Sequence, residues 1–128
     1  MRVSEHICVR YQLAVDILSR RWTTLIIKVL MPGPLHFNEI GTQLAVVSDR
    51  VLSERLKELE HKTIISRTVC GGPPIRVTYA LTEKGRDLAP IVDAIDNWSH
   101  QWVSLDEAAD IPDEAPSADE AVSANDQG

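Results

Sequence analysis

The chain has 128 residues, 44% hydrophobic and 25% charged, with a formal net charge of −6, a composition typical of one globular domain with a modest core. No apolar run approaches the roughly 18 residues that cross a bilayer, and the N-terminus lacks the apolar stretch of a signal peptide, so we expect a cytoplasmic protein with no membrane partner. Cys8 and Cys70 lie far apart and outside any CxxC pattern, and the histidines are scattered. These features exclude a disulfide framework and predict neither a metal site nor another cofactor.

The negative net charge argues against a DNA-binding protein only until its distribution is considered. Residues 1–103 hold 13 basic and 11 acidic residues, a net of +2, whereas residues 104–128 hold 8 acidic residues and no basic one. From about Leu105 onward there is no periodic apolar face, so we expect residues 104–128 to be a disordered acidic tail behind a domain of residues 1–103. Two roles stay open for this tail: a solvated terminus, or an autoinhibitory mimic of DNA.

Two amphipathic helices are predicted first along the chain. Their apolar residues follow helical spacing: Tyr11, Ala14, Val15 and Leu18 in the first, then Trp22, Leu25, Ile26, Val29 and Leu30 in the second. Residues 32–34, Pro-Gly-Pro, end the second helix because proline removes a donor and restricts its neighbour. A turn or short strand is expected at residues 35–36.

A short helix and a longer polar-faced helix come next. Phe37, Ile40 and Leu44 form the apolar side of the short one, and residues 45–47 form a tight connection to Ser48. Ser48 is a good N-cap for the longer helix. The buried side of this longer helix is predicted to be Leu52, Leu56 and Leu59, and its outward side Asp49, Arg50, Ser53, Glu54 and Lys57. Such an outward composition suits a helix that enters a major groove.

Two β-branched runs, residues 64–69 and 75–81, then flank a Gly/Pro-rich loop and predict a hairpin. Its second strand alternates a core face with a wet face: Val77, Tyr79 and Leu81 against Arg76, Thr78 and Ala80. Thr82 caps a further helix to about Ala89, and a last helix runs from Pro90 to about Val103. This order predicts a mainly α fold with a small β-hairpin, a winged helix-turn-helix with an extra C-terminal dimerisation helix.

The chain resembles the HxlR-type (MarR-like) family of winged helix-turn-helix regulators across roughly residues 8–103. The resemblance rests on Cys8, on RRW and LIIKVL within 20–30, on GPLHFNEI at 33–40, on VSDRVLSERLKELE at 47–60 and on PIRVTYALTEKG at 74–85. It implies a dimeric, DNA-binding transcriptional regulator, a repressor or an activator, and not an enzyme.

The sequence departs from the family at two places. Val9 stands where the family has proline after its N-terminal cysteine, and the interval from that cysteine to the tryptophan is one residue longer. Thr63 replaces the glycine that ends the fourth helix in the family. A β-branched residue is poor at positive φ, so we expect a different helix exit, with Lys62 or His61 at the cap.

The candidate DNA contacts are Ser48, Arg50, Ser53 and Lys57 on the fourth helix, Arg67 and Arg76 on the wing, and Asn38, with His36, at the start of the third helix. Arg50 can read guanine bidentately, whereas Lys57 suits a phosphate, and Ser48 with nearby backbone N–H groups suits another. The alternative for these residues is an ordinary solvated face, with Arg76 in an ion pair with Glu83 or another acid.

An apolar stripe on the last helix, together with the first helix, predicts a homodimer on a pseudo-palindromic operator. The predicted interface residues are Leu88, Ile91, Val92, Ile95, Trp98, Trp102, Tyr11 and Val15. The stripe packing on its own core is the alternative.

Cys8 is the candidate sensor residue. The start of the first helix and neighbouring Arg10 and His6 favour a reactive thiolate, and the resemblance implies sensing of an oxidant, an electrophile or a small-molecule effector there. The alternative is that Cys8 is a small apolar residue at an interface, and Cys70 at the wing tip has no evident partner. A protein–protein interaction module without DNA binding also stays open, whereas GxSxG, phosphate-loop and paired-carboxylate motifs of enzymes are missing.

Overall fold

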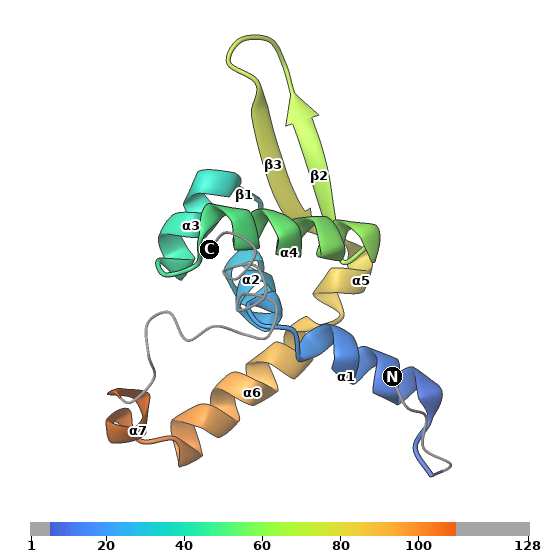
Figure 1. Cartoon of the computed structure of the whole chain (residues 1–128), viewed down its shortest axis with the longest axis vertical. Helices are drawn as coiled ribbons and strands as arrows, with labels where there is room; N and C mark the ends of the chain where they lie inside the picture. Colours follow the sequence, from blue (N-terminus) through green and yellow to red (C-terminus); the bar gives the residue numbers. More distant parts are fainter. Residues whose placement is uncertain (1–5, 110–128) are drawn as a thin grey trace, which may run out of the picture.

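A computed structural model describes residues 6–109 (Figure 1). Its elements in chain order are α1 (Val9–Leu18), α2 (Thr23–Leu30), β1 (Leu35–His36), α3 (Phe37–Leu44), α4 (Asp49–His61), β2 (Ile65–Cys70), β3 (Arg76–Leu81), α5 (Glu83–Arg86), α6 (Ala89–Trp102) and α7 (Leu105–Ala109). The predicted fold class, mainly α with a small hairpin, is confirmed. No helix in this part of the chain is long and apolar enough to cross a membrane.

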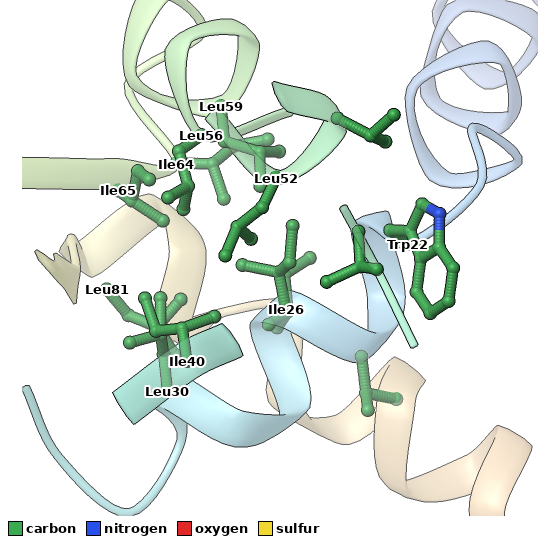
Figure 2. Close-up of a cluster of buried hydrophobic side chains, with 14 residues drawn as sticks. Trp22, Ile26, Leu30, Ile40, Leu52, Leu56, Leu59, Ile64, Ile65 and Leu81 are labelled. Atoms are coloured by element: carbon green, nitrogen blue, oxygen red, sulfur yellow. The ribbon is translucent and has the colours of Figure 1, made fainter. Parts of the chain in front are cut away.

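The core lies where α2, α3 and α4 meet the base of the hairpin. Figure 2 shows Leu52 and Leu56 of α4 beside Ile26 of α2, all of them fully buried. The predicted buried side of α4 is therefore confirmed. The prediction for α2 is wrong at Leu25, which is exposed, while Ile27 is fully buried. Helical spacing explains the difference, because Thr23, Ile26, Ile27 and Leu30 share one face and Leu25 falls beside it.

The hairpin belongs to a three-stranded antiparallel sheet with the order β1-β3-β2. Residue 35 pairs with Tyr79, and β2 pairs with β3 from Ile65–Leu81 to Cys70–Arg76. The predicted alternation along β3 is weaker than expected, because residues 77–80 are all half-buried. β3 is the central strand of the sheet, so β1 and β2 shield it on both edges.

The helices after the hairpin differ from expectation in length. α5 ends at Arg86, before the predicted Ala89, and α6 starts at Ala89. Gly85 in α5 is buried against the carbonyl of Ile64, where a Cβ atom would collide with the backbone oxygen. This close approach fixes α5 against the start of β2.

Helix α7 lies inside the segment predicted to be a disordered tail. Ser104 and Glu107 form a reciprocal capping box: Glu107 N donates to Ser104 Oγ at 3.1 Å, and Ser104 N donates to Glu107 Oε2 at 2.8 Å. The S-x-x-E spacing was the sequence signal for this helix. The rest of the predicted tail, residues 110–128, lies outside the described residues, and the division into domain and tail stays a prediction.

The exit of α4 corrects the expectation for Thr63. Lys62 is the C-cap, as predicted, but Thr63 adopts a left-handed conformation with φ 60°. The N–H of Ile64 donates to Leu59 O at 2.9 Å, the Schellman pattern that glycine usually completes. Thr82 Oγ1 and Lys84 Nζ donate to the carbonyls of Thr63 and Lys62, each at 2.6 Å. Two residues that follow the hairpin, Thr82 and Lys84, therefore hold this turn in place although Thr63 is β-branched.

We predict that Thr63→Gly raises the free energy of unfolding by about 1 kcal/mol, because a residue with a Cβ atom is strained in the left-handed region. Urea denaturation of the variant and the parent protein measures this. Thr68→Gly in β2, where the backbone is extended, is the control and should lower stability by roughly 0.5–1 kcal/mol. Equal or lower stability of Thr63→Gly would show that Thr63 is unstrained.

Candidate nucleic-acid interface

The turn between α3 and α4 sets the direction of α4. The side chain of Glu39 accepts from His36 N at 2.8 Å at the start of α3. Ala45 reverses the chain with φ 62°, and Ala45 N donates to Gly41 O at 2.8 Å. Ser48 then caps α4, its Oγ accepting from Val51 N at 3.2 Å, as its position in the sequence predicted. As at any helix start, the other N–H groups of the first turn of α4 have no carbonyl partner within the helix.

The two sides of α4 differ sharply in burial. Arg50, Glu54 and Lys57 are exposed and Ser53 is half-buried, whereas five residues on the opposite side are buried. Neither the side chain of Arg50 nor that of Lys57 makes a hydrogen bond or an ion pair within residues 6–109. The predicted outward face is thus available to a partner, and DNA contact by these residues stays a prediction.

The hairpin extends beyond α4 on the side where α3 and β1 also lie (Figure 1). Arg67 and Arg76 are exposed on its strands, and the described residues show no ion pair for either, including the alternative of Arg76 with Glu83. A groove of about 420 Å³ separates the wing from the start of α3, and Asn38 and Arg76 both line it. The structure therefore brings these two predicted contacts together.

The side chain of His36 contacts the wing and thereby joins the start of α3 to β3. The sequence had instead suggested that His36 contacts the DNA backbone. Its Nδ1 lies 3.1 Å from Val77 O and 3.4 Å from Thr78 Oγ1. The imidazole is therefore already engaged by β3, and Asn38 is the more accessible of the two polar side chains.

Arg55 is the residue of this region that the sequence analysis missed. It lies on the buried side of α4, and its side chain is only 2% exposed. Its Nε donates to Arg21 O at 3.0 Å and its Nη1 to Glu58 Oε1 at 3.2 Å. The Nη2 of Arg20 donates to the same Glu58 oxygen at 3.0 Å. An arginine three residues after Leu52 and one before Leu56 falls on the apolar side of the helix, and that spacing was the available signal.

The apolar stripe of α6 is exposed over most of its length. Trp98 and Trp102 are 61% and 66% exposed. The other exposed members of the predicted interface are Ile91, Ile95, Tyr11 and Val15. Val92 corrects the prediction, because it is only 3% exposed and belongs to the core, and Leu88 is half-buried against that core. These two residues hold α6 onto its own subunit.

A salt bridge also fixes α6 to α2. Lys28 Nζ lies 3.0 Å from Asp96 Oδ2. The hydrogen bond from Lys28 holds the pKa of Asp96 below its usual value, so this pair stabilises the fold near neutral pH and the contribution is lost as acid protonates the carboxylate.

Cys8 is the N-cap residue of α1 and is exposed. A groove of about 350 Å³ runs along α1, lined by Ile7, Tyr11, Gln12, Val15, Asp16 and Ser19. Cys70, also exposed, ends β2 at the wing tip. Within the described ranges no three histidine, cysteine or acidic residues gather as metal ligands would.

A sequence profile described as HxlR-like helix-turn-helix matches residues 17–107. The chain belongs to this family. The HTH-type transcriptional regulator YvaP of Bacillus subtilis is 48% identical over 96 residues, which cover 75% of this chain and 89% of YvaP. YodB of the same organism, also an HTH-type transcriptional regulator, is 41% identical over 95 residues, which cover 74% of this chain and 85% of YodB.

Solved structures of relatives agree with the HxlR-like fold. The reduced form of YodB has a TM-score of 0.68 at 40% identity and covers 77% of this chain and 96% of its own. The redox regulator HypR in its reduced form has a TM-score of 0.71 at 29% identity and covers 77% of this chain and 98% of its own. The chain is therefore a winged-helix transcriptional regulator, as predicted, and not an enzyme.

We predict that Ser48→Ala lowers the free energy of unfolding by about 1 kcal/mol, because it removes the acceptor that caps the first turn of α4. Ser53→Ala is the matched control. It removes a hydroxyl from the same helix, and this hydroxyl makes no hydrogen bond among the described residues. Equal stability of both variants in urea denaturation would contradict the capping role.

Proposed function

We propose that this protein binds duplex DNA sequence-specifically as a homodimer, with α4 in the major groove and the wing against the sugar-phosphate backbone. The observation that carries the proposal is the set of exposed basic side chains on α4 and the hairpin that have no partner within residues 6–109. Arg50 and Lys57 come from α4, and Arg67 and Arg76 from the wing. Cations that a fold leaves unpaired beside a protruding helix suit phosphates and base edges.

Each of these groups has a distinct proposed contact. Arg50, near the start of α4, reads a guanine bidentately, with Ser53 beside it, and Lys57 one turn later meets a phosphate. The capped start of α4 at Ser48 accepts a second phosphate on its N–H groups. Arg67, Arg76 and Asn38 position the duplex through its backbone and carry no sequence information.

We predict that Arg50→Ala with Lys57→Ala abolishes preference for the specific site, because direct base readout and a phosphate contact are lost together. The salt dependence should also fall, by about 1 in the log–log slope for each lost phosphate contact. Fluorescence anisotropy with DNA from upstream of the protein's own gene, at several salt concentrations, measures both.

The control for this experiment is Arg10→Ala with Lys62→Ala, which removes the same charge from outside the α4 face. It should leave DNA affinity close to that of the parent protein. Unchanged binding by the Arg50 and Lys57 double variant would contradict the groove assignment.

The exposed stripe on α6 supports the proposed homodimer. Two tryptophans among isoleucines form a patch of the kind that fills the centre of a subunit interface. The α1 residues Tyr11 and Val15 extend this apolar surface. A two-fold dimer places two copies of α4 about one turn of DNA apart, which matches a pseudo-palindromic operator.

We predict that Trp98→Glu converts the dimer to a monomer, because it places a charge inside the desolvated interface. Sedimentation equilibrium measures the mass. Ile75→Glu is the control: Ile75 is similarly exposed but lies on the wing, so that variant should stay dimeric. Dimers of unchanged affinity with Trp98→Glu would exclude the α6 interface.

Cys8 is the proposed sensor of an oxidant or electrophile. Among the relatives, YodB has been solved in a quinone-bound and in a diamide-treated form, and the redox regulator HypR in reduced and oxidised forms. The position of Cys8 supports the same role here: it is exposed at the start of α1, the helix that carries Tyr11 and Val15 of the proposed dimer surface. A modification at this point alters the packing of α1 and thereby the spacing of the two α4 helices.

We predict that diamide weakens operator binding by the parent protein, and that Cys8→Ser abolishes this response while keeping the affinity of the reduced form. Cys70→Ser is the matched control and should respond as the parent does. Equal responses of the Cys8→Ser and parent proteins in anisotropy titrations would exclude Cys8 as the sensor.

A winged helix that binds another protein is the second candidate function. Asp49 and Glu54 favour it, because these exposed carboxylates stand on the same face of α4 as Arg50 and Lys57. Affinity for DNA that lacks a steep dependence on salt would support this alternative.

A further inference from the structure

An acidic side chain stands in the middle of the exposed face of α4. Glu54 follows Arg50 by four residues and precedes Lys57 by three, so the three side chains form one line along the helix. All three are exposed. The side chain of Glu54 makes no hydrogen bond and no ion pair within residues 6–109, neither with Arg50 nor with Lys57. A negative charge therefore lies between the two cations that the proposed function directs at DNA.

The next carboxylate along α4 has a different environment. Glu58 Oε1 accepts from Arg55 Nη1 at 3.2 Å and from Arg20 Nη2 at 3.0 Å, so this carboxylate joins α4 to the residues before α2. Glu54 lies one helical turn earlier and joins no other element in the described part of the chain. Its charge is therefore available to a partner outside the chain, as are the charges of Arg50 and Lys57.

A carboxylate at this position is unfavourable for DNA in general. Phosphates are negative, so an unpaired Glu54 beside them lowers the affinity for every sequence alike. This repulsion is offset only where the duplex offers the carboxylate a donor, and the major-groove donors are N4 of cytosine and N6 of adenine. Adenine also places its N7 acceptor beside N6, which repels the second carboxylate oxygen, whereas cytosine presents N4 alone. Glu54 is thus suited to cytosine.

We propose that Glu54 is a specificity-determining residue that accepts a hydrogen bond from N4 of a cytosine in the major groove. This assignment rests on the proposed function, because it requires α4 in the groove. Four residues of helix rise by about 6 Å and base pairs stack about 3.4 Å apart, so the cytosine lies within about two base pairs of the guanine read by Arg50. Glu54 then selects against sites without this cytosine, since its charge there meets phosphates and acceptors but no donor.

The test is the selection of bound sequences from a library of random duplexes, by the full chain and by its variant Glu54→Gln. Glutamine keeps the shape of the side chain, removes its charge and pairs with N7 and N6 of adenine. We expect the site enriched by the parent protein to contain the cytosine, and the site enriched by Glu54→Gln to carry adenine at that position. In anisotropy titrations, replacing this cytosine by thymine should weaken binding by the parent about fivefold or more. The same replacement should leave the affinity of Glu54→Ala unchanged.

Glu60→Gln is the matched control, because Glu60 is an exposed glutamate in the last turn of the same helix, away from the line of Arg50, Glu54 and Lys57. It should keep the cytosine of the parent's site, and a gain in affinity common to both glutamine variants measures the loss of charge alone.

Three results would count against the assignment. The same enriched site for the parent protein and Glu54→Gln would overturn it and leave the proposed function intact. A base other than cytosine at the position that responds to Glu54→Gln, or an equal response to Glu60→Gln, would overturn it as well. A parent protein that enriches no sequence would instead contradict the proposed function, and the assignment of Glu54 with it.

Discussion

The division of α4 into a buried and an exposed side is the constraint on which the rest of the molecule depends. Leu52, Leu56 and Leu59 are removed from water against α2 and the hairpin base, and this burial fixes the rotation of α4 about its own axis. The rotation in turn decides that Arg50 and Lys57 face outward. Since a helix repeats every 3.6 residues, burial of the leucines and exposure of the basic residues are one geometric fact.

α2 connects α4 to the apolar stripe of α6. Its apolar face contributes Ile26, Ile27 and Leu30 to the core, while Lys28 on its outer side holds Asp96 of α6. The residues just before α2 join α4 through Arg55 and Glu58. One short helix therefore contacts both the long C-terminal helix and α4, one on each of its sides.

Periodicity, caps and glycine or proline signals predicted the order of helices, the turn before Ser48 and the wing. They succeed because those features are local: a cap needs only the next three residues, and an apolar face only its own helix. Val92 was misplaced because α6 is apolar on more than one side, and spacing does not say which side meets the core. Arg55 and the conformation of Thr63 depend on partners distant in sequence, among them Arg21 and Lys84, and local patterns carry no information about those.

At the junctions between the helices, residues other than glycine occupy the positions with positive φ. Trp22, Ala45 and Thr63 all have positive φ, and each stands at a helix boundary. Left alone, such residues prefer other backbone conformations, so the surrounding tertiary contacts must hold them. An excised peptide of α3 and α4 would consequently lose its bends, because the contacts that hold them come from the rest of the fold.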